Sequence, residues 1–403
     1  MEELKKNNCT AAGRGNTFVY AGNWTVQAED NESGIGIYKY SEEDGSLQYL
    51  ETVRPDITPG IICADQRRNV LYMVDEQKNS PAFAMQGGGG RVLAFSVGRE
   101  DGSLTQLGEE QPSFGTLPTY AAQDGTGNWL VVVNHGDKQA ITKAVKGRDG
   151  KFRVVTDFSE VTVALYPLDR DGSILPACDM LKFEPDRSVI PVKNACLHAV
   201  YFAPDGEHLI ITNMKQDRVL MLRIDHRRRE LAICDTLRCP EGSWPRYGTF
   251  HPEKKLFYMN NERALTVNTI RYDENGCLSM VQTLNASPGL GCVKEGKRIS
   301  QSDIKISKDG KFVYDFYRYT DALTVFAVDE ESGLLTMIQS LELKEKRPRG
   351  FAVSPDGRFL LVANLTGSIT RLAVAADGTV SKEEVVDRNM KCPGNILFYS
   401  SEE

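Results

Sequence analysis

Ionisable side chains recur at matching positions of a repeated pattern, and these positions are the best candidates for chemistry. In four segments, with weaker copies upstream, an apolar strand, a Pro-Asp-Gly-like turn and a second strand follow one another. The residue that starts the first strand belongs to one set, which contains His198, Arg246, Ser302 and Arg349. The residue that follows the second strand belongs to the other set, which contains Glu76, His135, Met214, Glu262, Arg318 and Leu365.

The two sets bring together imidazole, guanidinium and carboxylate groups. A position used only for packing would repeat one residue type, which these positions do not. Charges around one cavity are costly unless they are solvated, paired or bound to a ligand. The excess of arginine predicts a pocket for a small anionic molecule, because a guanidinium group binds carboxylate or phosphate through two parallel hydrogen bonds.

Each candidate also has a structural interpretation that the sequence leaves open. Arg349 could brace neighbouring repeats, Glu262 could pair only with an arginine, and His135 or His198 could satisfy local backbone groups. Ser302 is not expected to be a nucleophile, because no G-x-S-x-G motif surrounds it. It remains a candidate for substrate binding.

The repeat predicts the fold. Each unit has a period of about 50 residues and about four short strands, and seven units follow one another. This pattern predicts an all-β protein, a seven-bladed β-propeller of four-stranded antiparallel blades. Blades stack around an axis because one sheet cannot bury both of its faces alone.

The two ends of the chain predict how the ring closes. The first unit begins at a second strand over residues 17–23, and a lone strand occurs near residues 395–399. We expect this C-terminal strand to join the first blade, which removes exposed strand edges. The predicted organisation is an N-terminal tail over residues 1–14 and a single propeller domain over residues 15–403. Residues 140–160 are predicted to form an inserted loop or hairpin, and residues 79–90 form a second excursion.

Composition narrows the function classes. The net charge of −7 argues against a nucleic-acid surface, and no run of 18 apolar residues predicts a membrane span. The first residues lack the apolar core of a signal peptide, and the nine cysteines form no C-x-x-C pair. We therefore expect a cytoplasmic protein with reduced cysteines, no metal site and no cofactor. His208 and His251 lie in turn regions and are expected to be exposed; the oligomeric state is not encoded in any pattern.

Several motifs resemble a known family. The turns of residues 202–206 and 353–357, the segment Cys196-Leu197-His198-Ala199, the tripeptide Trp244-Pro245-Arg246 and the pair Asn261-Glu262 look like those of bacterial 6-phosphogluconolactonase propellers. Fungal carboxymuconate-lactonizing enzymes belong to the same family. The resemblance covers roughly residues 15–400 and implies a seven-bladed propeller with its active site at one mouth of the channel.

The resemblance also implies a set of catalytic residues. One histidine, two arginines and one glutamate carry over onto His198, Arg246, Arg318 and Glu262, and the family's acidic residue onto Asp303. Two departures indicate a reshaped pocket. Cys196 stands where the family often has a second histidine, and the usual Asn-Arg-Gly context of the later arginine is here Tyr317-Arg318-Tyr319.

Three functions are compatible with these observations. The first is metal-independent hydrolysis of a phosphorylated or carboxylated lactone, with His198 and Glu262 sharing the roles of base and acid in an order the sequence leaves open. In this hypothesis Glu76, His135, Ser302, Asp303 and Arg349 help to bind the substrate. The second is lactonization of an unsaturated dicarboxylic acid. The third is a non-enzymatic interaction scaffold, which the clustering of charge at matching channel positions disfavours.

Overall fold

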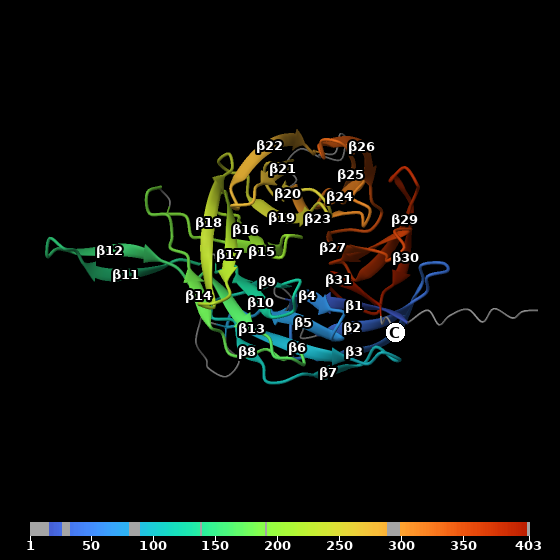
Figure 1. Cartoon of the computed structure of the whole chain (residues 1–403), viewed down its shortest axis with the longest axis horizontal. Coiled ribbons are helices and arrows are strands. Elements are labelled where there is room, and N and C mark those ends of the chain that lie inside the picture. The colour runs from blue at the N-terminus through green and yellow to red at the C-terminus, as the bar shows by residue number, and fades with distance from the viewer. Residues whose placement is uncertain are drawn as a thin grey trace, which may run out of the picture.

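Seven antiparallel blades, each with a path of four strands, are arranged in a ring in the computed structural model of the chain (Figure 1). The structure describes residues 16–25, 33–79, 89–137, 139–189, 192–287 and 299–400. Every regular element in these ranges is a strand. The predicted seven-bladed propeller is therefore confirmed, whereas the predicted tail over residues 1–14 and most of the excursion at 79–90 lie outside the described residues.

The first four blades, each given from its innermost strand outward, have the following bounds. Blade 1 consists of β31 (Pro393–Ser400), β1 (Thr17–Asn23), β2 (Ile35–Tyr40) and β3 (Leu47–Val53). Blade 2 consists of β4 (Pro59–Asp65), β5 (Val70–Asp75), β6 (Arg91–Val97) and β7 (Leu104–Gln106), and the short β8 (Gln111–Pro112) also pairs with β6. Blade 3 consists of β9 (Pro118–Gln123), β10 (Trp129–Asn134), β13 (Thr162–Pro167) and β14 (Asp179–Lys182). Blade 4 consists of β15 (Leu197–Phe202), β16 (His208–Asn213), β17 (Arg218–Asp225) and β18 (Glu230–Arg238).

The remaining three blades follow the same order. Blade 5 consists of β19 (Pro245–Phe250), β20 (Leu256–Asn261), β21 (Thr266–Tyr272) and β22 (Leu278–Asn285). Blade 6 consists of β23 (Ser300–Ile306), β24 (Phe312–Arg318), β25 (Ala322–Val328) and β26 (Leu335–Glu342). Blade 7 consists of β27 (Pro348–Val353), β28 (Phe359–Asn364), β29 (Ser368–Val374) and β30 (Val380–Asp387).

The ring closes through the C-terminal strand, as predicted. β31 pairs antiparallel with β1, and the register places Asn395 opposite Gly22 and Tyr399 opposite Phe18. Each innermost strand also contacts the innermost strands of both neighbouring blades, in the closed order β4, β9, β15, β19, β23, β27, β31 and back to β4. Because β31 pairs with β1, the strand β1 has no exposed edge where the two ends of the chain meet.

The apolar cores lie between adjacent blades. One of them packs Val131 and Val163 of blade 3 against Leu209 and Leu220 of blade 4, all of them buried. Each such side chain stabilises the fold by about 1.5–3 kcal/mol relative to its exposed state. Tyrosines add hydrogen bonds between blades; for example, the Tyr258 hydroxyl of blade 5 donates to the Gly333 carbonyl of blade 6 at 2.7 Å.

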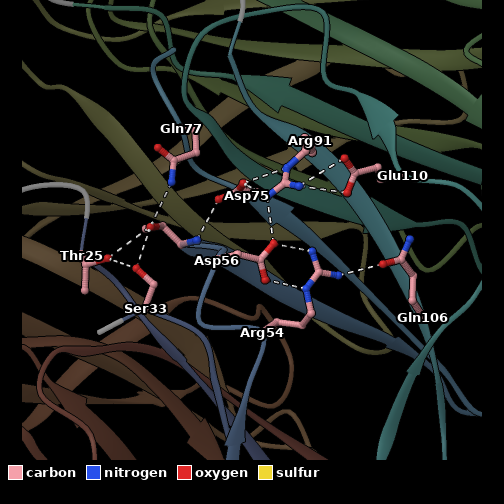
Figure 2. Close-up of polar contacts among 10 residues, drawn as sticks. Thr25, Ser33, Arg54, Asp56, Asp75, Gln77, Arg91, Gln106 and Glu110 are labelled. Carbon is pink, nitrogen blue, oxygen red and sulfur yellow. Dashed lines mark hydrogen bonds and ion pairs between the residues drawn. The ribbon is translucent and has the colours of Figure 1, made fainter. Parts of the chain in front are cut away.

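The second strand ends in a buried asparagine in five of the seven blades, and this residue can hold the innermost strand in place. The side-chain oxygen of Asn213 accepts a hydrogen bond from the Cys196 backbone N–H at 3.1 Å. In blade 2 the corresponding residue is Asp75, which accepts from the Thr58 N–H at 2.7 Å and pairs with Arg91 at 2.8 Å (Figure 2). Burial raises the pKa of the Asp75 carboxyl, and Arg91 opposes that rise. Most other blades have a neutral asparagine at this position. A buried carboxylate needs a counter-charge there, and Arg91 provides it.

The inserted segment of blade 3 is a hairpin, as predicted. β11 (Ile141–Lys146) pairs with β12 (Phe152–Asp157), and this two-stranded sheet projects away from the ring (Figure 1). All six residues of β11 are exposed, so the hairpin packs little against the propeller beyond its base.

The expected exposure of His208 and His251 is wrong, because both are buried. Each imidazole bonds within its turn. The Nδ1 of His251 accepts hydrogen bonds from the backbone N–H groups of Glu253 and Lys254 at 3.0 Å, in the place an aspartate takes in other blades. Glycines of the neighbouring blades, Gly276 and Gly310, then pack against the two rings and cover them.

Candidate active site

A β-bulge lies near the start of every innermost strand. In each blade the register between the first and second strands shifts by one residue at this point. Such a bulge leaves an extra residue unpaired and redirects it. From blade 1 to blade 7 the bulges contain Gly394, Gly60, Thr119, His198, Arg246, Ser302 and Arg349.

Side chains from both predicted sets line one cavity of about 150 Å³ at this end of the channel. Seven of the nine predicted site residues are among them: Glu76, His135, His198, Arg246, Glu262, Arg318 and Arg349. The convergence results from the ring, because matching positions of different blades meet at the axis although they are far apart in the sequence.

Glu262 lies between two arginines. Its Oε2 atom is 2.9 Å from Nε of Arg246 and 3.3 Å from Nη2 of Arg318. Arg246 is only 2% exposed and also donates from Nη1 to the Ser302 carbonyl. Burial, together with the charge of Arg246, lowers the pKa of Arg318 to about 9, and Glu262 opposes that shift. The carboxylate therefore compensates two buried cations that would otherwise repel each other.

A second carboxylate organises the opposite side of the cavity. Glu76 Oε2 accepts a hydrogen bond from Trp24 Nε1 at 2.7 Å and lies 3.6 Å from Nη2 of Arg349. The Arg349 guanidinium also stacks 4.3 Å from the centre of the Trp24 ring and donates to the Gly394 carbonyl at 3.0 Å. Burial raises the pKa of Glu76, and Arg349 and Trp24 oppose the rise.

His198 is buried with one ring nitrogen that has no partner. Its Nδ1 makes no hydrogen bond to any residue the structure describes. Its ring packs edge-on against Tyr247, with the ring centres 4.7 Å apart. Burial, followed by the charges of Arg246 and other neighbours, holds the pKa of His198 well below its usual range. The imidazole is therefore neutral at pH 7 and can accept a proton or a hydrogen bond inside the cavity.

His135 is fixed by two contacts. Its Nδ1 lies 2.9 Å from the Gly136 carbonyl oxygen, and its Nε2 lies 2.9 Å from Sγ of Cys196. A carbonyl only accepts, so Nδ1 carries the proton of this contact, and when the ring is neutral Nε2 accepts from the thiol. The Cys196 thiol thus helps to fix the orientation of His135.

Ser302 and Asp303 do not line this cavity. Ser302 is fully buried and its hydroxyl donates to the Phe316 carbonyl at 3.1 Å. Asp303 accepts from the Phe351 N–H at 3.1 Å, pairs with Lys305 and lines a separate cavity toward the other end of the channel. The structure therefore brings seven of the nine predicted residues together and places these two elsewhere.

Several residues that line the cavity were not predicted from the sequence. Trp24 follows Asn23, the end of the second strand of blade 1, so the rule that found Glu76 would have found it too. Trp244 and Arg347 precede the prolines that start innermost strands, and both have a left-handed backbone, with φ of 58° and 59°. No sequence pattern predicts a left-handed backbone at a tryptophan or an arginine, because this conformation is uncommon for non-glycine residues.

A larger cavity of about 680 Å³ adjoins the first, and both are lined by His135 and Trp244. Its walls include Phe158 at the base of the hairpin, Lys193, Lys215 and Arg263. Among the described residues, no group of three or more His, Cys, Asp or Glu side chains could hold a metal ion. None of the described segments forms a helix with the length and hydropathy that a membrane crossing requires.

Fold and site together define a seven-bladed β-propeller in which acid, base and cationic side chains converge in one cavity on the channel axis. The chain matches the family model "Lactonase, 7-bladed beta-propeller" over residues 18–395, and it belongs to this family. The predicted family is thereby confirmed.

Relatives with assigned names agree with this membership. A 6-phosphogluconolactonase of Formosa agariphila is 24% identical over 338 residues, which are 82% of this chain and 85% of the relative. One of an Enterobacter species is 26% identical over 344 residues, 84% of this chain and 87% of the relative. These relatives support the predicted enzyme class, a lactone hydrolase.

Solved structures share the fold. A periplasmic gluconolactonase of Pseudomonas aeruginosa aligns with a TM-score of 0.79 at 23% identity, covering 96% of this chain and 100% of its own. A protein of Bacteroides uniformis described as a putative 6-phosphogluconolactonase aligns with a TM-score of 0.77 at 22% identity, with the same coverage.

Proposed function

We propose that this protein hydrolyses the lactone of an acidic sugar derivative at the charged mouth of its channel. The proposal rests on the buried cavity. The neutral imidazole of His198 lines it together with guanidinium groups that form ion pairs with Glu262 and Glu76. Opening a lactone requires a base to activate water and donors to stabilise the oxyanion that forms on the carbonyl. The cavity contains both kinds of group, and the named relatives are lactonases.

His198 is the proposed general base. The neutral imidazole has one ring nitrogen with a lone pair, which would take a proton from water as that water attacks the carbonyl carbon. The C–O bond of the ring then breaks, and the imidazolium returns the proton to the departing alkoxide. In this assignment one histidine serves as base and then as acid, so Glu262 is left with a different role.

Glu262 is proposed to hold Arg246 and Arg318 in place rather than to move the proton itself. Its Oε2 atom is engaged by both guanidinium groups, so we assign it a positioning role. The two arginines then present N–H donors to the developing oxyanion, and their fixed positions avoid reorganisation during the reaction. Loss of Glu262 would therefore disturb the donors as well as the local charge.

The substrate is proposed to be anionic, and the reaction to need no metal. Four arginines and two glutamates line the cavity, so cations outnumber carboxylates in a protein that is acidic overall. We also propose a cytoplasmic location, which the thiol state of the described cysteines favours. The Pseudomonas aeruginosa protein of the same fold is named a periplasmic gluconolactonase, so the fold itself does not decide the location.

The test is ring opening of D-glucono-δ-lactone and of its 6-phosphate by purified protein dialysed against a chelator. Proton release above the spontaneous rate is expected for at least one of them, and it should disappear in the His198→Ala, Glu262→Gln double variant. Formation of a lactone from an unsaturated dicarboxylic acid, without hydrolysis, would instead support the cyclase alternative. The proposal would be contradicted if neither the lactones nor the dicarboxylic acid reacts.

A further inference from the structure

The large outer cavity carries cations that the proposed chemistry does not use. The residue that follows the second set of predicted positions forms another ring around the mouth. In blades 1 to 7 this ring contains Thr25, Gln77, Gly136, Lys215, Arg263, Tyr319 and Thr366. Only the adjacent blades 4 and 5 place cations there, and both cations line the outer cavity.

Lys215 and Arg263 converge on one aromatic ring. The Lys215 ammonium lies 5.0 Å from the centre of the Trp244 ring, and the Arg263 guanidinium lies 5.5 Å from it. Such contacts hold cationic side chains over the face of the ring. The tryptophan therefore acts as a platform that confines two otherwise flexible side chains.

The platform itself is rigidly held. Trp244 has a left-handed backbone with φ of 58°, and its N–H donates to Asp217 Oδ1 at 2.9 Å. The other oxygen of Asp217 accepts from the Gly242 N–H at 2.9 Å, and this carboxylate is buried. The buried carboxylate thus fixes the backbone from which the indole ring projects.

The charge balance differs between the two cavities. In the inner cavity Arg246, Arg318 and Arg349 each have a carboxylate within 4.0 Å. In the outer cavity Lys193 pairs with Glu241 at 3.2 Å. Neither Lys215 nor Arg263 has an ion pair with any carboxylate of the described residues. Arg347 of the inner cavity also has no ion pair with the described residues, so each cavity has positive charge that no carboxylate compensates.

We propose that Lys215 and Arg263, confined by Trp244, form a subsite for an acidic group that the substrate carries away from its lactone ring. This inference rests on the proposed function and specifies which lactones the site would prefer. The paired guanidinium groups of the inner cavity act on the lactone carbonyl, and the unpaired cations of the outer cavity bind the distal phosphate or carboxylate. Trp244 and His135 line both cavities, so the two cavities adjoin, and the substrate would extend from one into the other.

The experiment compares the Lys215→Met, Arg263→Met double variant with wild type. For the 6-phosphate of D-glucono-δ-lactone, KM should rise at least tenfold while kcat stays within about threefold, because only binding energy common to ground and transition states is removed. For D-glucono-δ-lactone itself both constants should stay within about twofold. The matched control is Arg229→Met, which removes an arginine from another tryptophan, Trp129, outside the mouth. This control should change neither substrate's KM.

Calorimetric binding of the hydrolysis products gives a readout that does not depend on turnover. Wild type should bind 6-phosphogluconate at least tenfold more tightly than gluconate, and the double variant should lose that preference. Tighter binding of glucarate than of 6-phosphogluconate would assign the subsite to a carboxylate rather than a phosphate. Equal binding of all three, or an unchanged preference in the variant, would overturn the subsite even if the lactone itself is hydrolysed. Absence of turnover together with a preference lost in the variant would overturn the proposed function and leave the anion site standing.

Discussion

The two ends of the channel are built from the same seven strands and yet have different chemistry. At the starts of the innermost strands, guanidinium, carboxylate and imidazole groups fill a small buried cavity. Toward the strand ends, a cavity of about 480 Å³ is lined by Tyr120 and Tyr201, whose ring centres are 5.0 Å apart, together with Asp303 and Lys305. Burial raises the pKa of both tyrosines, which therefore stay neutral.

The β-bulges account for part of this difference. All seven lie at the strand starts, where they turn residues such as His198 and Arg349 toward the axis. Beyond the bulges the pairing is regular, and ordinary alternation places tyrosines and small residues at the channel. A β-bulge that recurs in every blade can thus place charged side chains at one end of a channel. Substitutions at the two ends should therefore have unequal consequences.

The largest expected effect is on stability. Arg246→Leu leaves Glu262 buried with one cation fewer, and breaking such a pair costs about 3–5 kcal/mol of unfolding free energy. Lys305→Met removes the more exposed ion pair with Asp303 at the other end and should cost at most about 1 kcal/mol. Urea denaturation followed by tryptophan fluorescence measures both. Equal losses would show that the two ends do not differ in how they bury charge.

The next effect is on catalysis. His198→Ala and Glu262→Gln should each lower kcat about a hundredfold or more, because one removes the base and the other releases the arginines that stabilise the oxyanion. Asp303→Asn, at the other end, should leave kcat and KM within about threefold. A large loss in Asp303→Asn would mean that the site extends along the channel, as the family resemblance suggested for this residue.

The pH dependence separates the base from its surroundings. Burial and the neighbouring arginines hold the pKa of His198 well below 6.5 in the free enzyme, so the acidic limb of kcat/KM should lie well below pH 6.5. A bound anion offsets the arginine charges, so the acidic limb of kcat should lie at higher pH. Coincident limbs at pH 6.5 would indicate a solvated histidine and a different base.

The same shift predicts how stability responds to acid. In the unfolded chain the imidazole has its ordinary pKa of about 6.5, so below that pH the unfolded state binds more protons than the folded state. The contribution of neutral His198 to stability is full above pH 6.5 and is lost as pH falls toward its folded pKa. His198→Gln should therefore reduce the loss of unfolding free energy between pH 7 and pH 5. An unchanged pH dependence would contradict the burial of a neutral imidazole.

The smallest effect is expected within the mouth itself. Cys196→Ala removes the thiol that contacts His135 but no group proposed to touch the reacting atoms. It should change kcat by less than about threefold, and Cys196→Ser should restore any loss because a hydroxyl can donate to the same nitrogen. A hundredfold loss in Cys196→Ala, rescued by neither serine nor a change of pH, would assign the thiol a chemical role.

Much of the fold and most of the site follow from the repeat in the amino-acid sequence. The recurrence of turn and strand predicts the number of blades, and because a ring superposes matching positions, it also predicts that Arg246 and Glu262 meet. The same reasoning misplaces the exposure of His208 and His251, since a turn position in one blade is covered by glycines of the next. Contacts between blades are not written in the pattern of a single repeat.

The architecture and most of the charged residues of the inner cavity are therefore specified by the sequence alone, because both follow from periodicity and from residue type at equivalent positions. Tertiary structure decides which end of the channel each side chain reaches. Ser302 and Asp303 both lie in the bulge of blade 6, yet one is enclosed by backbone and the other faces the opposite cavity. Tertiary structure also decides that Glu262 binds two arginines at one oxygen and that Trp244 holds Lys215 and Arg263, since these contacts depend on a bulge and a left-handed residue that no residue type specifies.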